Sequence, residues 1–335
     1  MNSTGKQEGK APRPRIVAVE EHFRTPELEA VIDGPEKLFS KALGESLGEL
    51  GEGRIQIMDE AGIDVQVLSS AAPHLQWMPP AQAVDVAKRV NDGLATAIDA
   101  FPERFAGLAT LATPSPADAA RELERTVADL GFRGAMIHGH SEGRFLDDSF
   151  YWPMLEAAEA LDVPVYLHPT YAPKAVMDAY YSGLPGPFGM MLATGIMGWH
   201  YETGMHAMRM VLGGVFQRFP KLQLILGHGG EGVPFFLDRA IKVLRRAAPD
   251  MSDHLAATYR NNFYVTTSAF FSDAPLKCAL ELTPPDRILF ATDYPYSQAK
   301  DGTDWILSTS AVDDVQRKAI LHGNSDRLFR LGDSA

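Results

Sequence analysis

The sequence predicts a (β/α)8 TIM barrel, a closed ring of eight parallel strands surrounded by helices. Eight short apolar runs rich in β-branched residues recur along the 335 residues. Stretches with the apolar spacing of amphipathic helices lie between these runs. Most of the runs are apolar throughout rather than alternating, which is typical of parallel strands buried on both faces. A doubly wound open sheet is the alternative arrangement for the same order of elements.

The predicted strands, in chain order, are Arg15–Val19, Asp64–Ser70, Phe105–Leu111, Gly134–Ile137, Val163–Leu167, Leu222–Leu226, Asn262–Thr267 and Arg287–Ala291. Helical patterns between them are clearest over Ala81–Ala100, Pro116–Leu130 and Ser149–Leu161. Two segments fit this alternation poorly. Residues 24–56 form an insert after the first strand, and residues 170–200 form a long loop after the fifth. Because long loops inside compact domains are usually functional or disordered, we expect residues 170–200 to form a lid or a pocket wall.

We expect one domain over residues 15–335, preceded by a disordered tail over residues 1–14. After residue 14 the chain has no repeat, low-complexity block or Pro/Ser-rich linker that would mark a domain boundary. The tail is rich in Gly, Lys, Pro and Ser and has no apolar stretch, so it does not resemble a secretory signal. The apolar run Phe188–Trp199 contains glycines and is well short of the roughly 20 residues that cross a bilayer. These features favour a cytoplasmic protein.

Composition excludes several classes of function. The formal net charge of −12 argues against a nucleic-acid partner, which would need a basic face, and against an anionic membrane surface. The single cysteine, Cys278, rules out an intrachain disulfide and a zinc site built from several thiolates. Positive charge for an anionic substrate must therefore come from a bound metal or from a few arginines.

Carboxylate and imidazole side chains follow four of the predicted strands. Glu20 and His22 follow the first strand two residues apart, so they share a face in extended chain. His168 follows the fifth strand, His228 the sixth and Asp293 the eighth. The carboxyl ends of barrel strands converge on one mouth, where the active sites of this fold lie. Oxygen and nitrogen ligands without sulfur suit Zn²⁺, Mn²⁺ or Fe²⁺, so the pattern predicts one catalytic divalent metal ion.

His228 and Glu231 form a second motif at the end of the sixth strand. Their spacing of three allows the Glu231 carboxylate to accept a hydrogen bond from the imidazole of His228. That contact favours a general acid/base role for His228. The alternative is that His228 is a further metal ligand supported by Glu231.

The remaining histidines give weaker signals. His138 and His140 share a face after the fourth strand, so one of them could bind substrate and the other could lie at the surface; a second metal held by the pair is the less favoured alternative. Arg239 could bind an anionic substrate from the helix after Glu231, although an exposed salt bridge is as consistent with its position. The other histidines lack such placement and are expected to be structural: His74, His200, His206, His254 and His322.

Several segments of the chain resemble the amidohydrolase superfamily. They are AVEEHF, VYLHP, MRMVLGGVFQRFPKLQLILGHGGEGVPF, RILFATDYPY and NSDRLFRL. The resemblance is closest to the γ-resorcylate (2,6-dihydroxybenzoate) decarboxylases and their aminocarboxymuconate-semialdehyde decarboxylase relatives. It implies a (β/α)8 barrel with one zinc or manganese ion, no organic cofactor, and assembly into homodimers or homotetramers.

The resemblance also implies roles for particular residues. The implied metal ligands are Glu20, His22, His168 and Asp293, with Asp293 also the proton donor. His228 and Glu231 are implied to form the acid/base pair. Close relatives have arginine where this chain has Thr170 and asparagine where it has His138, and both positions are expected to line the pocket. The full set of expected substrate contacts is His138, Phe23, Arg239, Tyr296 and Thr170.

The expected reaction is non-oxidative decarboxylation of a small aromatic acid that carries an ortho hydroxyl group. In it, a ring carbon is protonated and CO₂ is then lost. The alternative is metal-dependent hydrolysis of a lactone or amide, because a metal with a flanking acid serves both reactions. A barrel that keeps its metal only for structure is a third hypothesis, disfavoured because all six candidate site residues are present.

Overall fold

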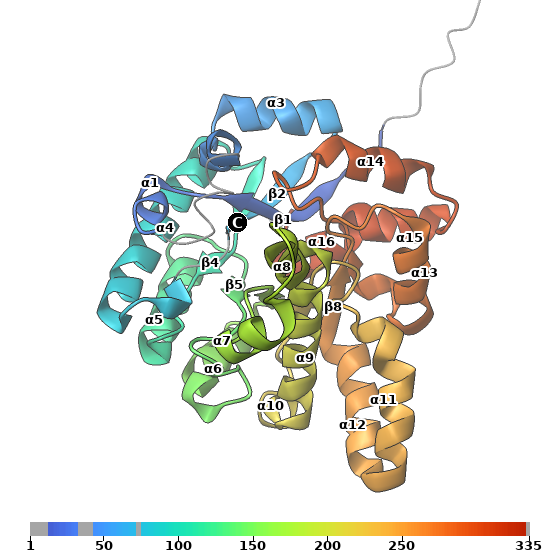
Figure 1. Cartoon of the computed structure of the whole chain (residues 1–335). Helices are drawn as coiled ribbons and strands as arrows, with labels where there is room; N and C mark the ends of the chain where they lie inside the picture. The colour runs from blue at the N-terminus through green and yellow to red at the C-terminus, as the bar shows by residue number, and fades with distance from the viewer. Residues whose placement is uncertain (1–12, 33–42, 72–74, 333–335) are drawn as a thin grey trace, which may run out of the picture.

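The computed structural model describes residues 13–32, 43–71 and 75–332. The strands all run parallel, in the order β1 (Val17–Phe23), β2 (Val65–Ser70), β3 (Phe105–Gly107), β4 (Ala109–Thr110), β5 (Ala135–His138), β6 (Val165–His168), β7 (Leu224–Leu226), β8 (Phe263–Thr266) and β9 (Ile288–Leu289). Helices surround this ring of strands (Figure 1).

Three backbone contacts turn the strands into a closed barrel. Leu108 N donates to Leu68 O at 2.9 Å and Ala109 N donates to Gly134 O at 2.8 Å, so β3 and β4 are successive parts of the third barrel strand. Val19 forms a parallel bridge with Ala291, which joins the first strand to the last. The predicted (β/α)8 barrel is therefore confirmed, and the open sheet is excluded.

The main helices follow the strands as the sequence predicts. Their bounds are α1 (Pro26–Glu29), α3 (Glu52–Ala61), α4 (Pro80–Ala100), α5 (Pro116–Ala128), α6 (Trp152–Ala160), α9 (Gly198–Leu212), α10 (Val215–Arg218), α11 (Val233–Ala247), α12 (Pro249–Asn262), α13 (Asp273–Leu282), α14 (Ala299–Ser308), α15 (Asp314–Lys318) and α16 (Asn324–Phe329). Several begin with proline in the first turn, where the missing N–H costs nothing and the fixed φ suits a helix.

The hydrophobic core has two layers. The inner layer fills the barrel with side chains such as Val17, Val67, Tyr166 and Ile225, and Phe329 of α16 belongs to it. The outer layer lies between the strands and the helices. Because Asp326 of α16 pairs with Arg15, just before β1, α16 covers the amino-terminal end of the barrel. The opposite, carboxyl-terminal end is left for the site.

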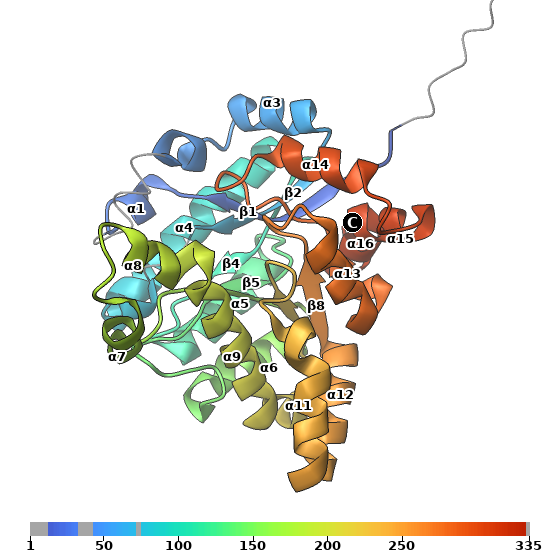
Figure 2. The ribbon, with the colours of Figure 1, turned by 45° about the vertical axis from the view of Figure 1, so that its right-hand side comes forward.

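Residues 170–200 differ from the predicted loop. They contain α7 (Lys174–Val176), α8 (Phe188–Met191) and short helical turns at Met177–Tyr181 and Leu192–Ile196. Figure 2 shows α7 and α8 at one side of the barrel, next to the start of α9. The apolar residues between the glycines and prolines are enough to form these short helices against the neighbouring α9.

The first strand is also longer at its end than predicted, because β1 continues through Glu20, Glu21 and His22. Most of the predicted tail lies outside the described residues. Arg13, which the prediction placed in that tail, donates to Asp64 at 2.8 Å and is held against the barrel. Within the described part of the chain, we find no helix with the length and apolar character that a membrane span requires.

Candidate active site

A bulge in β1 aims two candidate ligands into the barrel. The pairing of β1 with β2 shifts register between Val19 and Glu21, and Glu20 has a φ of +64°. A bulge of this kind inserts one residue and resets the alternation of the side chains. Val19 belongs to the inner core, and after the bulge both Glu20 and His22 lie inside the mouth of the barrel. Glu21 lies on the outer face, bonded to Thr292.

Four of the candidate residues have a left-handed backbone. The φ angles are +64° at Glu20, +48° at His228, +54° at Glu231 and +62° at Asp293. Such angles are uncommon for residues other than glycine and are usually held by surrounding structure at functional sites. The glycines on either side of His228 and Glu231 allow the whole turn 228–232 to remain left-handed.

The predicted metal ligands converge on one point. His168 Nε2 lies 3.4 Å from Glu20 Oε1, and His22 Nε2 lies 3.2 Å from Asp293 Oδ1. Ligand atoms about 2 Å from one ion are themselves separated by roughly 3–3.5 Å, so these spacings fit a single cation. Glu20 Oε1 and His22 Nε2 are buried and make no hydrogen bond with any described residue. A cation is the partner that this donor set fits.

The floor of the cluster is built around Glu20. The hydroxyl of Tyr166 donates a hydrogen bond to Glu20 Oε2, which leaves Oε1 directed at His168. Gly227 allows this close approach, because a Cβ there would lie 2.9 Å from the Tyr166 hydroxyl and 3.0 Å from Glu20 Oε2. The glycine before His228 is therefore required by packing around the ligand.

His228 and Glu231 interact as predicted. His228 Nδ1 lies 2.7 Å from Glu231 Oε1, and its Nε2 lies 3.7 Å from Glu20 Oε1 and 3.8 Å from Asp293 Oδ2. The other oxygen of Glu231 lies 2.7 Å from Nδ1 of His200. The sequence analysis assigned His200 to a structural role, and that expectation is wrong about its position, because His200 lies at the cavity and contacts the acid/base pair.

Burial and neighbouring charges set the protonation of these groups. Burial, with the neighbouring imidazoles, lowers the pKa of His168 to about 3, so His168 is neutral, the form that binds metals. Burial would also lower the pKa of His228, but the carboxylates of Glu231 and Glu20 outweigh it and hold that pKa well above its usual value. Burial raises the pKa of Asp293, but the neighbouring imidazoles of His22 and His228 lower it more, so that pKa lies below its usual value. His228 is therefore the more basic member of the pair that it forms with Asp293.

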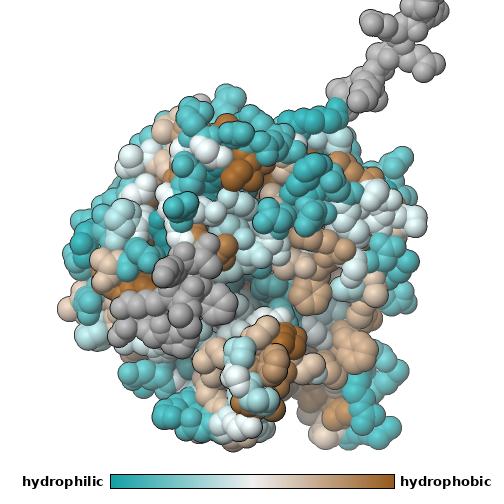
Figure 3. All heavy atoms as spheres, turned by 45° about the horizontal axis from the view of Figure 1, so that its top comes forward, coloured by the Kyte–Doolittle hydropathy of each residue, from teal (hydrophilic) through white to brown (hydrophobic). Residues whose placement is uncertain are grey.

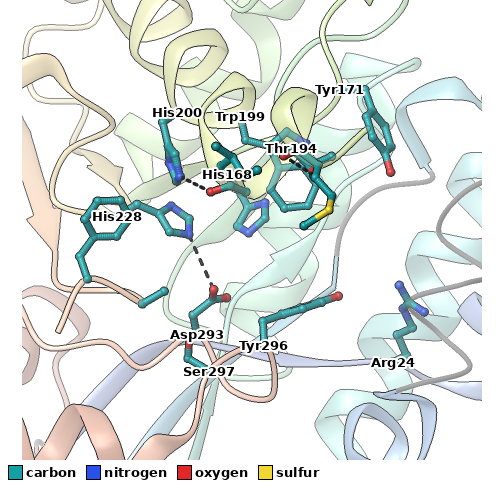
Figure 4. A pocket seen from close by; sticks show the side chains of 15 residues that line it. Arg24, His168, Tyr171, Thr194, Trp199, His200, His228, Asp293, Tyr296 and Ser297 are labelled. Carbon is teal, nitrogen blue, oxygen red and sulfur yellow. Dashed lines mark hydrogen bonds and ion pairs between the residues drawn. The ribbon is translucent and has the colours of Figure 1, made fainter. Parts of the chain in front are cut away.

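A cavity of about 440 Å³ opens beside the cluster (Figure 4). Its floor includes His168, His228 and Asp293, and its walls are mainly apolar and aromatic. The wall residues are Tyr171, Met191, Thr194, Gly195, Ile196, Trp199, His200, Ala269, Phe270, Tyr296, Ser297 and Arg24. Seven of them belong to the predicted long loop, so that segment forms a pocket wall, as expected.

Arg24 is a cavity residue that sequence analysis missed. Its side chain is 3 % exposed and contacts Glu29 at 3.4 Å. Burial raises the pKa of Tyr296 to about 12 despite a hydrogen bond from Arg24 to the phenol. In Figure 4 the Tyr296 side chain extends from the Asp293 loop toward Arg24. The only sequence signal for Arg24 is its position two residues after His22. A search for metal-ligand patterns does not count arginine, so it passes over this position.

Only some of the expected substrate contacts line the cavity. Tyr296 lines the cavity, and its ring packs edge-on to that of His22. His138 is half-buried beside the His168 ring. Thr170 is buried and accepts a hydrogen bond from Gln76. Neither is among the described residues that line the cavity.

The structure does not support the positions expected for Phe23 and Arg239. Phe23 is fully buried in the outer core layer, because it follows His22 and points to the opposite side of β1. Arg239 lies on the exposed side of α11, outside the cavity of its own chain. Both were expected from sequence proximity to the site motifs, which does not fix the direction of a side chain.

A buried polar network lies directly behind the cluster. Arg54 of α3 donates from Nη1 to the carbonyl of His22 at 2.7 Å and from Nε to Gln66 at 2.7 Å, and it stacks over Tyr294. Gln66 in turn donates to Glu21 at 2.9 Å. Burial raises the pKa of Glu21 to about 8. The network ties α3, β1 and the Asp293 loop into one rigid support.

Comparisons with known proteins agree with this geometry. The family model described as amidohydrolase matches residues 21–331. The chain is 37 % identical to a γ-resorcylate decarboxylase from Polaromonas sp., over 94 % of this chain and 98 % of that protein. It is 32 % identical to the decarboxylase orsB of Emericella nidulans, over 95 % of this chain and 98 % of that protein.

A solved structure extends the comparison to the fold. The dihydroxybenzoic acid decarboxylase from Polaromonas sp. JS666, determined with manganese and the inhibitor 2-nitroresorcinol, superposes with a TM-score of 0.86. It is 34 % identical over 95 % of this chain and 98 % of that chain. The protein thus belongs to the amidohydrolase family, within the branch that contains the γ-resorcylate decarboxylases.

Proposed function

We propose that this protein is a metal-dependent carboxy-lyase that removes CO₂ from a small hydroxylated aromatic acid without oxidation. The observation that carries the proposal is the cluster of Glu20, His22, His168 and Asp293, of which His168 and Asp293 line a cavity with aromatic walls. Relatives over nearly the whole chain bear the names of decarboxylases, and one was solved with manganese. No organic cofactor is part of the proposal.

The four residues would hold one divalent ion, Zn²⁺ or Mn²⁺. When bound, the metal supplies positive charge that neutralises and orients the carboxylate and the neighbouring phenolate of the substrate. Asp293 belongs to the floor of the cavity and lies 3.2 Å from His22, so it would face both the ion and a substrate ring bound in the cavity. His228 holds the proton next to it, and Glu231 fixes the orientation of His228.

The reaction balances without an added oxidant. A proton passes from His228 by way of Asp293 to the ring carbon that bears the carboxylate. The carbon–carbon bond to the carboxylate then breaks, its electrons restore the aromatic ring, and CO₂ leaves. Tyr171, Trp199 and Phe270 exclude water from the ring and hold it in place. Arg24 and Tyr296 provide polar contacts at another part of the wall, where a hydroxyl or carboxylate substituent can be bound.

The test is a mass balance on purified protein. Metal analysis should find about one Zn²⁺ or Mn²⁺ per chain. A panel of hydroxybenzoates that includes 2,6-dihydroxybenzoate should release one CO₂ per acid consumed, with neither oxygen nor nicotinamide added. Removal of the metal with a chelator should abolish turnover, and added Mn²⁺ should restore it. The panel should also contain lactones and amides, because turnover of those compounds with no CO₂ release from any acid would overturn the proposal in favour of hydrolysis.

We also propose that the chain assembles into a homodimer or homotetramer. Large apolar side chains are exposed on the segment 180–201 and on α11, with Tyr180 73 % and Phe235 74 % exposed. Figure 3 shows apolar surface gathered on part of one face of the molecule. Apolar patches of this kind on a folded chain mark association surfaces.

A further inference from the structure

The carboxylate of Glu231 is held by two imidazoles, one on each oxygen. Oε1 lies 2.7 Å from His228 Nδ1, and Oε2 lies 2.7 Å from His200 Nδ1. The side chain of Glu231 is fully buried. Two donors on opposite oxygens fix the carboxylate against rotation about its terminal bond, which one donor alone does not.

His200 also connects Glu231 to the wall of the cavity. It is near the start of α9, its side chain is 17 % exposed, and its Nε2 lies 3.3 Å from the carbonyl oxygen of Gly195 (Figure 4). Its ring packs edge-on to His228 at 4.9 Å and to Phe270 at 5.3 Å between ring centres. The imidazole therefore has a contact on each side that fixes its position.

We propose that His200 is a positioning residue for the reaction, acting on His228 through Glu231. By holding Oε2, it keeps Oε1 in place, so that His228 Nε2 remains directed between Glu20 and Asp293. Partners of this kind, one contact removed from the reacting groups, set the orientation and tautomer of a histidine. This inference rests on the proposed function for its kinetic consequence, but its geometry can be tested separately.

The same three side chains could instead bind a cation, because His200, His228 and Glu231 each offer a ligand atom within 4.8 Å of the others. The distances favour hydrogen bonds. Each imidazole nitrogen lies 2.7 Å from its own carboxylate oxygen, whereas ligands of one ion are separated by roughly 3–3.5 Å. Metal stoichiometry distinguishes the two arrangements.

The kinetic test compares His200→Ala, His200→Asn and a matched control. His200→Ala should lower kcat about 10- to 100-fold on 2,6-dihydroxybenzoate, as loss of such a supporting contact typically does, with little change in KM. His200→Asn should recover part of that loss, because its amide can donate an N–H to Glu231. The control is His322→Ala, which removes a histidine–carboxylate pair (2.8 Å to Asp326) far from the cavity and should leave kcat unchanged.

A spectroscopic test does not depend on turnover. In the zinc-loaded protein with ¹⁵N-labelled histidine, NMR should show two low-field Nδ1–H protons bonded to a carboxylate in the site. His200→Asn should remove one of these signals and shift the other. Unchanged kcat in His200→Ala, loss of a second metal equivalent in that variant, or a single low-field signal in the wild type would each overturn the proposal. If no acid is decarboxylated, the NMR result still decides it.

Discussion

At the scale of single residues, Asp293 joins the two halves of the site. It lies 3.2 Å from His22 on the ligand side and 3.8 Å from His228 on the acid/base side. No other described residue of the cluster contacts both histidines through the two oxygens of one carboxylate. Asp293 is therefore placed both to hold the ion and to pass a proton.

Asp293→Asn removes the group that transfers the proton. We expect kcat to fall by at least about 100-fold, the usual contribution of a positioned acid or base. Turnover should be measured at saturating Mn²⁺, with metal content checked in the same samples, so that loss of metal is separated from loss of proton transfer. Asp304→Asn is the control, because that aspartate pairs with Lys300 on the surface of α14. Normal turnover in Asp293→Asn would contradict the proton role.

The residues that sequence reasoning found and missed differ in one respect. Glu20, His168 and Asp293 follow apolar strands directly, and the barrel places such positions at its mouth. His200 lies near the start of α9, and Arg24 is the first residue after β1. Their contribution depends on tertiary contacts with Glu231 and Tyr296, and no local spacing encodes those contacts.

At the scale of elements, β1 depends on its attachment to α3. The bulge at Glu20 breaks the regular ladder, and the carbonyl of His22 accepts its hydrogen bond from Arg54. The guanidinium is fully buried and stacks over Tyr294, which follows Asp293. One helix residue therefore holds the ends of both ligand-bearing segments.

Arg54→Met should loosen this attachment. It leaves the His22 carbonyl and Gln66 without their donor, and it leaves Glu21 without a nearby positive charge, so we expect a loss of about 3 kcal/mol in the free energy of unfolding. Metal affinity should weaken about 10-fold or more. Urea unfolding and metal titration measure the two effects. Arg89→Met, which removes an exposed ion pair with Asp85 on α4, should change neither quantity. Equal values for both variants would show that the network gives no support to the site.

Element boundaries were predicted less well than element order. The sequence analysis ended the first strand at Val19, where the apolar run gives way to Glu20–Glu21–His22. The structure continues it to Phe23. Hydrogen bonds from Tyr166 to Glu20 and from Gln66 and Thr292 to Glu21 compensate the burial of both carboxylates, and the pairing with β2 continues past them. Residues 170–200 gave the converse error, since glycine and proline masked the short helices α7 and α8.

At the scale of the whole molecule, the order of strands and helices was enough to predict the barrel. The closure of the ring was not fixed by any one element, because an open sheet uses the same order. The position of the site at the carboxyl-terminal end followed from the fold. The set of residues that line the cavity did not, because it depends on how the segment 170–200 packs.

The free energy of unfolding of the whole fold at acid pH should depend in part on one buried histidine. Burial lowers the pKa of His206 to about 3, and its Nε2 accepts a hydrogen bond from Leu146 N at 2.8 Å. Below its usual pKa near 6.5, His206 binds a proton in the unfolded chain but not in the folded one, so stability falls as pH decreases from about 6.5 toward 3. His206→Gln removes this proton site.

From pH 7 to pH 5, the wild type should lose about 2 kcal/mol more in the free energy of unfolding than His206→Gln does. Urea unfolding at the two pH values measures the difference. His254→Gln, on the outer helix α12, should lose as much as the wild type. Parallel losses in the wild type and His206→Gln would show that His206 titrates alike in both states.

The left-handed backbone at Glu20, His228, Glu231 and Asp293 has a consequence for engineering. Glycine at any of these positions would relieve conformational strain, so a screen for more stable variants would select glycine there. Each such change would also delete a group that the chemistry uses. Thermal stability and turnover therefore place opposite demands on the same four residues. Thermostabilising substitutions are better sought on the outer helices.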